Sequence, residues 1–124
     1  MVGPLYDLEY FSLSPDGRHI AFTLNQDGYS RLELIDLTSG MTRPGPALPD
    51  GVLGIYDERL AFSTDATALA FSYTTPRSSS NVYVWEWAAM GQGVRPLSQM
   101  THGGIPTEAF VEGALVRYLS LIHI

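Results

Sequence analysis

The chain repeats one pattern of turns and strands after about 49 residues, and no other feature limits its possible folds as strongly. Residues 14–17 (SPDG) lead into the strand pattern of residues 20–23 (IAFT). Forty-nine positions later, residues 63–66 (STDA) lead into residues 69–72 (LAFS). A later strand pattern in each copy matches at an offset of 50. We therefore interpret the chain as two copies of one supersecondary unit.

The first copy has strong turn and strand signals. Pro15 favours the second position of a tight turn, and Gly17 closes that turn. Residues 18–24 then alternate, which predicts a half-buried strand with Ile20, Phe22 and Leu24 on one face and His19, Ala21 and Thr23 on the other. A polar break at residues 25–28 separates this strand from a second one at residues 31–37, of which residues 32–37 match residues 82–87 of the other copy.

The second copy keeps the strands and weakens the turn. Thr64 and Ala66 stand where the first copy has proline and glycine, so we expect a less sharply specified hairpin. Three prolines predict that residues 41–54 form a loop with at most a short outer edge strand. Residues 94–98 are interpreted as the outer strand of the second copy.

A repeat of this length with about four short strands per copy is the spacing of β-propeller blades. We predict an all-β chain that forms a partial β-propeller of about two to three blades of four antiparallel strands, a fragment of a larger ring. An unrelated β-sandwich is the alternative. The expected units are an incoming strand or loop of a preceding blade (1–9), two blades (10–50 and 51–100), an exit segment toward a further domain (101–118) and a non-native tail from sequencing-adapter read-through (119–124).

Composition excludes several classes of protein. Seven basic against thirteen acidic side chains give a net charge of −6 without a basic cluster, which argues against nucleic acid as a partner. Cysteine is absent, which excludes disulfides and thiolate metal sites. No apolar run approaches the roughly 20 residues of a membrane span, and no signal peptide is visible. We expect no membrane partner and favour the cytoplasm.

The repeats resemble the propellers of the prolyl oligopeptidase family of serine peptidases and of the periplasmic Tol system. Residues 25–32 (NQDGYSRL) look like a loop from a late blade of the bacterial peptidases. Residues 101–106 (THGGIP), followed by 110–112 (FVE) and 115–118 (LVRY), are similar to the segment that leads from that propeller into an α/β-hydrolase domain. After Tyr118 the sequence departs from the family pattern.

The resemblance implies a role for the chain within a longer protein. The propeller would gate and filter the access of peptide substrates to a catalytic α/β-hydrolase domain that this chain lacks. The chain itself would then be inactive, and its partners would be that domain and the peptide. The alternative is a non-enzymatic propeller like that of the Tol system, which would act as a scaffold for protein interactions.

The residues themselves offer little chemistry. A hydrolase serine needs a Gly-x-Ser-x-Gly elbow, and the nearest string, residues 28–32 (GYSRL), lies between two predicted strands. We therefore predict no catalytic residue, no cofactor and no metal site, and we interpret His19 as a solvated strand histidine. Trp85 and Trp87 are expected to pack between blades. Tyr29 and Arg31 remain weak candidates for contact with a substrate or with an acid of another domain, against a plain surface or interface role.

Overall fold

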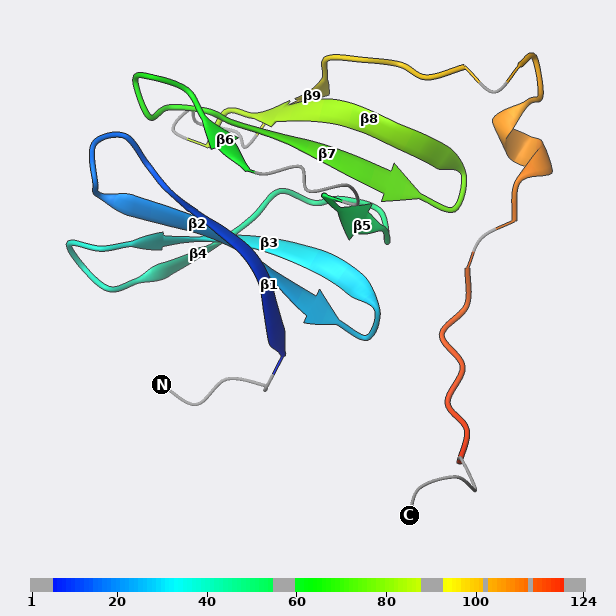
Figure 1. The fold of residues 1–124 in the computed structure, drawn as a ribbon, viewed down its shortest axis with the longest axis horizontal. Helices are drawn as coiled ribbons and strands as arrows, with labels where there is room; N and C mark the ends of the chain where they lie inside the picture. Colours follow the sequence, from blue (N-terminus) through cyan, green and yellow to red (C-terminus); the bar gives the residue numbers. More distant parts are fainter. Residues whose placement is uncertain (1–5, 55–59, 88–92, 102, 112, 120–124) are drawn as a thin grey trace.

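The computed structural model describes residues 6–54, 60–87, 93–101, 103–111 and 113–119 as an all-β chain of two stacked antiparallel sheets (Figure 1). The first sheet is a simple meander in the order β1-β2-β3-β4. Its strands are β1 (Asp7–Leu13), β2 (His19–Gln26), β3 (Tyr29–Asp36) and β4 (Thr42–Pro44). This is the strand order of a propeller blade.

The second sheet repeats that order with a divided innermost strand. Its strands are β5 (Val52–Leu53), β6 (Ala61–Phe62), β7 (Leu69–Thr75), β8 (Ser78–Trp85) and β9 (Val94–Pro96). The path runs β5-β7-β8-β9, and β6 also pairs with β7. Together β5 and β6 occupy the place that β1 holds in the first sheet. The sheets are thus two adjacent blades of a partial propeller, as the repeat predicts.

Strand register reproduces the sequence offsets of the repeat. Ile20 pairs with Ile35 in the first blade, and Leu69 pairs with Trp85 in the second. The outer strands extend the match beyond what the sequence offsets show, because Arg43 pairs with Leu34 just as Arg95 pairs with Val84. The short outer strand expected within residues 41–54 is β4, and the one expected at residues 94–98 is β9. The expectation of a loop over the rest of residues 41–54 is wrong at its end, because β5 (Val52–Leu53) pairs there with β7 and begins the innermost strand of the second blade.

The innermost strand is where the two blades differ. Leu8 and Ser12 of β1 lie four positions apart, whereas their counterparts Leu53 and Ala61 lie eight positions apart. The second blade therefore has a four-residue insertion that separates β5 from β6. The inserted segment falls within residues 54–60, of which residues 55–59 lie outside the described part.

The core lies between the two sheets, where two different faces meet. The first blade contributes a face without aromatic side chains at its buried centre, which we call the small-residue face and define as Ala21, Thr23, Leu32 and Leu34. The second blade contributes a bulky face, which we define as Leu60, Phe62, Leu69, Phe71, Tyr73, Trp85 and Trp87. All but Phe62 of these are buried, and Phe62 packs against them. The predicted packing of Trp85 and Trp87 between blades is confirmed.

Two equivalent turns begin the second strand of each blade. In the first, the Gly17 amide donates to the Ser14 carbonyl, and in the second the Ala66 amide donates to that of Ser63, both at 2.9 Å. The serine hydroxyl in each donates to the aspartate two positions later. Ala66 adopts φ 57°, a left-handed conformation that favours glycine. The second turn therefore has the geometry of the first despite the loss of glycine.

The hydrogen-bonded aspartates of these turns predict that the folded protein loses stability in acid. The hydroxyls of Ser14 and Ser63 hold the pKa values of Asp16 and Asp65 below the usual range, and the Thr38 amide does the same for Asp36. A carboxyl whose folded pKa is lowered contributes stability that is present above its unfolded pKa, about 4, and is lost as the pH falls through the folded value. We expect the melting temperature to fall below about pH 4. Thermal melts between pH 6 and pH 2 check this, and replacement of Asp16 and Asp65 by asparagine should flatten the curve. An unchanged slope in that double variant would contradict the assignment.

Beyond the second blade the chain forms one short 3-10 helix, η1 (Thr107–Ala109), and then an extended segment that descends along the hairpin ends of both blades (Figure 1). Of the expected tail, residues 120–124 lie outside the described part. No helix in the described ranges has the length and apolarity to cross a membrane.

Candidate functional site

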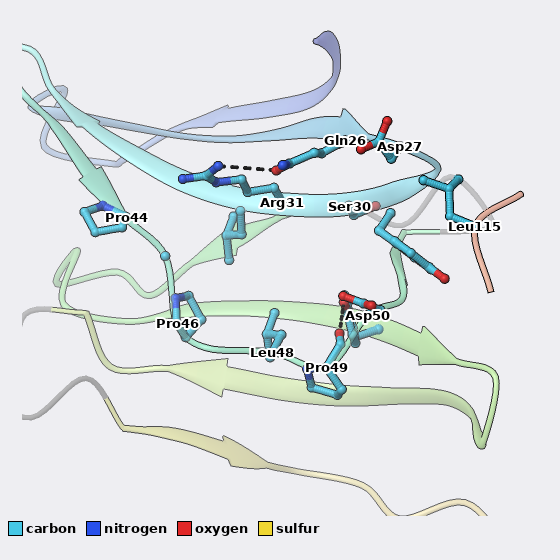
Figure 2. A pocket seen from close by; sticks show the side chains of 14 residues that line it. Gln26, Asp27, Ser30, Arg31, Pro44, Pro46, Leu48, Pro49, Asp50 and Leu115 are labelled. Carbon is cyan, nitrogen blue, oxygen red and sulfur yellow. Dashed lines mark hydrogen bonds between the residues drawn. The ribbon is translucent and has the colours of Figure 1, made fainter. Parts of the chain in front are cut away.

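A groove of about 540 Å³ lies at the hairpin end of the two blades (Figure 2). Four parts of the chain line it: the β2–β3 hairpin, the connection between the blades, strand β7 and the exit segment. Its lining residues are Gln26, Asp27, Tyr29, Ser30, Arg31, Leu32, Pro44, Gly45, Pro46, Leu48, Pro49, Asp50, Tyr73 and Leu115. Both residues that the sequence singles out, Tyr29 and Arg31, are among them.

A two-residue turn shapes one wall of the groove. Asp27 and Gly28 have φ values of 54° and 87°, the positive values at both central positions that define a type I′ hairpin. The Asn25 side chain accepts a hydrogen bond from the Gly28 amide at 2.9 Å. Because the turn has only two central residues, the segment between β2 and β3 is shorter than the sequence analysis predicts. Tyr29 and Arg31 lie in a strand that begins at residue 29, not in a loop before it.

Arg31 is held by partners within its own sheet. Its guanidinium lies 3.0 Å from Glu33 and donates to the Gln26 side chain at 3.3 Å. Leu32, the next residue, is buried against the second blade, so the alternation of β3 turns Arg31 toward the opposite face. In Figure 2 its side chain reaches toward Gln26 along the hairpin. The positive charge of Arg31 is therefore compensated at the rim of the groove.

The connection between the blades forms the opposite wall. The hydroxyl of Tyr73 donates a hydrogen bond to the Pro49 carbonyl. Burial raises the pKa of Tyr73 to about 12, and the nearby Asp50 carboxylate adds to this effect. Tyr73 is therefore a neutral donor at physiological pH. Asp50 is exposed and gives this wall a negative charge.

The exit segment closes the remaining side. Arg117 lies 3.0 Å from the Asp27 carboxylate. A methyl group at Gly113 would lie 3.5 Å from the Tyr29 hydroxyl and 3.6 Å from Pro76, in the hairpin of the second blade. Leu115, which lies between Gly113 and Arg117 in the sequence, lines the groove. The exit segment thus contacts the hairpin ends of both blades.

Ser30 connects the two blades at the floor of the groove. Its amide donates to the Gly51 carbonyl at 2.8 Å, and its hydroxyl accepts the Leu53 amide at 2.9 Å and donates to Glu9 at 3.1 Å. This serine belongs to the string nearest to a hydrolase elbow, but it lies inside β3 with its hydroxyl engaged by structural partners. Sequence reasoning did not identify this linking role.

Removal of the Ser30 hydroxyl should weaken the contact between blades. In Ser30→Ala the Leu53 amide and Glu9 each lose a partner, so we expect the free energy of unfolding to fall by about 1–3 kcal/mol. Urea unfolding measures this. The control is Ser39→Ala, whose hydroxyl accepts only the exposed Met41 amide and whose loss should cost less than about 0.5 kcal/mol. Equal losses in the two variants would count against the role of Ser30.

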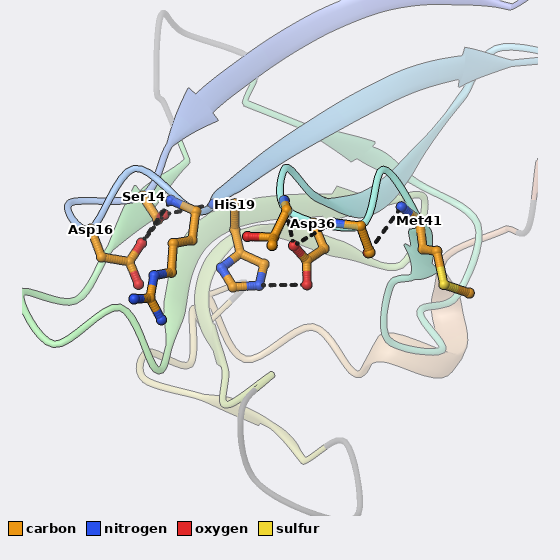
Figure 3. Close-up of polar contacts among 8 residues, drawn as sticks. Ser14, Asp16, His19, Asp36 and Met41 are labelled. Carbon is orange, nitrogen blue, oxygen red and sulfur yellow. Dashed lines mark hydrogen bonds and ion pairs between the residues drawn. The ribbon is translucent and has the colours of Figure 1, made fainter.

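A polar cluster lies at the other end of the strands (Figure 3). The Nε2 atom of His19 lies 3.9 Å from Asp36, and its ring stands 4.6 Å from that of Trp87 in the second blade. The expectation of a solvated histidine is therefore wrong, because His19 is half-buried between the blades. In the described part of the chain, no group of three or more histidine, aspartate or glutamate side chains could hold a metal ion.

Comparison with known proteins adds no assignment. No protein-family model matches this chain, and a search of curated proteins finds no match.

The groove combines a neutral phenol, two ion pairs and an exposed carboxylate with proline and leucine side chains. These groups suit noncovalent contacts with a peptide or with another domain.

Proposed function

We propose that the chain is the non-catalytic propeller portion of a prolyl oligopeptidase-like serine peptidase, where it gates and filters peptides on their way to an α/β-hydrolase domain encoded further along the same protein. The single observation that carries the proposal is the course of the exit segment. It lies against the hairpin ends of both blades, through Asp27, Tyr29 and Pro76, and borders the groove.

This course supports placing the catalytic domain over the hairpin end of the propeller. A domain that follows the exit segment would begin beside the groove, so that substrates would pass the groove walls on their way to the active site. The exposed Asp50 carboxylate and the aromatic Tyr29 would meet such peptides. In this proposal the blades bind and select, and the missing domain supplies the Ser-Asp-His triad that cleaves by acyl transfer.

The decisive test is the coding sequence downstream of Tyr118 in the source genome. We expect a reading frame that contains a Gly-x-Ser-x-Gly elbow within roughly two hundred residues, as an α/β-hydrolase domain requires. A stop codon soon after the second blade would instead indicate a scaffold propeller of the Tol type and overturn the proposal.

An activity assay provides the complementary test. The purified chain should not turn over chromogenic prolyl or acyl-amino-acid substrates. Turnover that a serine-directed phosphonate abolishes would show a nucleophile within this chain and contradict its proposed non-catalytic role.

A further inference from the structure

Alternate residues of the exit segment face the blades over residues 113–118, which we call the strap. A methyl group added to Gly113 would stand 3.5 and 3.6 Å from side chains of the two hairpins. Leu115 lines the groove beside the β2–β3 hairpin (Figure 2), and Arg117 forms an ion pair at 3.0 Å with the turn of that hairpin. Val116, between the last two, is 74% exposed. Since side chains two positions apart lie on one side of an extended chain, the strap turns one side to the blades and the other to solvent.

The strap is held by side chains alone. Within the described ranges, no backbone hydrogen bond joins it to either blade. Its ion pair is open to water, because the Arg117 side chain is 77% exposed and that of Asp27 is 44% exposed, and such pairs contribute little to stability. The hairpin, in contrast, is fixed by its type I′ turn and by the Asn25 side chain. The strap can therefore leave while the wall of the groove stays in place.

Departure of the strap uncovers negative charge. Asp27 loses its partner Arg117. Asp50, on the opposite wall, forms no ion pair within the part of the chain that the structure describes. Arg31 also lines the groove, but its charge is compensated by Glu33. The open groove thus presents two carboxylates, and a ligand with a basic side chain restores the balance that the strap provides in this structure.

We propose that the groove binds extended peptides in which an apolar side chain is followed two positions later by a basic one, and that the strap is an internal copy of such a ligand. The apolar side chain of the peptide takes the place of Leu115, and the basic one pairs with Asp27. The strap and the peptide therefore exclude each other. This assignment rests on the proposed function in one respect, that the ligand of the groove is a peptide.

The strap competes as a tethered ligand. A short tether gives an effective concentration in about the millimolar range, so a free peptide binds only where it overcomes this internal competitor. Loss of the ion pair between Arg117 and Asp27 weakens the strap and leaves the groove walls intact. Peptide affinity should rise when the strap loses its charge, although the substitution adds no contact to the peptide.

The test is a nuclear magnetic resonance titration of the ¹⁵N-labelled full chain with the peptide acetyl-Gly-Ala-Leu-Val-Arg-Tyr-amide, which copies the strap. The amide signals of Gly28 and Leu32 report occupancy of the groove. We expect Arg117→Gln to bind this peptide about two- to five-fold more tightly than the unmodified chain, the range that an exposed ion pair provides. Arg18→Gln removes an exposed positive charge at the other end of the strands and is the matched control, with unchanged affinity.

A second pair of titrations tests the basic side chain of the ligand. A peptide with glutamine in place of arginine should bind about two- to five-fold more weakly than the first peptide to Arg117→Gln. In the double variant Asp27→Asn with Arg117→Gln, the two peptides should bind equally, because the carboxylate that distinguishes them is gone. Cooperative thermal melts establish that each variant is folded, and the comparison of the two peptides on the unmodified chain needs no variant.

Three results would overturn the proposal. If neither peptide shifts the hairpin signals of any variant, the groove is not a peptide site. Equal affinities of Arg117→Gln and the unmodified chain would show that the strap does not compete, and equal affinities of the two peptides for Arg117→Gln would show that Asp27 does not select a basic side chain. None of these titrations bears on the downstream reading frame, so failure here is distinguishable from failure of the proposed function.

Discussion

Replacement of Phe71 by alanine is expected to lower the free energy of unfolding by about 3–5 kcal/mol, the usual cost of removing a large buried aromatic side chain. Phe71 is 2% exposed, and its ring lies 6.0 Å from that of Tyr83 and 6.4 Å from that of Tyr73. The truncation would open a cavity in the contact between the blades. Urea unfolding at low protein concentration, followed by far-ultraviolet circular dichroism, measures the loss.

The repeat supplies a matched control for this substitution. Phe22 is the same residue at the same position of the first blade, 49 residues earlier, but it lies on the face of β2 opposite to Ala21 and Thr23, which the second blade does not cover, and it is half-buried. We expect Phe22→Ala to cost only about 1 kcal/mol in the monomer. Similar losses in the two variants would contradict the arrangement in which the first blade covers the face that carries Phe71 and the second blade leaves the face that carries Phe22 uncovered.

Much of the blade geometry was predictable because strand periodicity and turn chemistry are local. The alternation from Arg18 to Leu24 and the equivalent turns at Ser14 and Ser63 are sufficient to locate the central strands. The constant offset between copies then predicts the observed register, since a one-residue slip would reverse the faces of a strand. The outer strands carry a further signal, the pair Arg-Pro at residues 43–44 and 95–96, which sequence reasoning did not use.

Sequence alone did not show which face of a blade is covered. Both faces of β2 are apolar, with Phe22 on one and Ala21 on the other, so alternation gives no sign of the partner. The burial of His19 was missed for the same reason. Its neighbour Trp87 is distant in the sequence and reaches it only because the two sheets stack.

The groove was predictable only in part. Tyr29 and Arg31 were identified because charged and aromatic residues beside a turn stand out in the sequence. Asp50, Tyr73 and Leu115 were not, because they come from three other segments and meet only through the packing of the connection and the exit segment. Candidate sites at a contact between blades depend on long-range geometry that no local pattern encodes.

That connection leads to the second large effect, expected for Gly51→Ala. A methyl group at Gly51 would lie 2.3 Å from the Thr74 carbonyl oxygen and 2.8 Å from the Tyr73 ring. Because a carbonyl within a sheet cannot move aside cheaply, the connection must lift from β7, and its hydrogen bond from the Ser30 amide would be lost. We expect the free energy of unfolding to fall by about 3 kcal/mol, the upper range for overpacking.

The control for this substitution is Gly93→Ala, because it adds the same methyl group where no atom lies within 4 Å and where the backbone is outside the left-handed region. There, alanine restricts only the unfolded chain, so stability should stay unchanged or rise by up to about 1 kcal/mol. Urea unfolding of both variants compares them directly. If Gly51→Ala proves as stable as Gly93→Ala, the connection does not lie against β7, and the groove wall formed by Pro49 and Asp50 would have to be placed elsewhere.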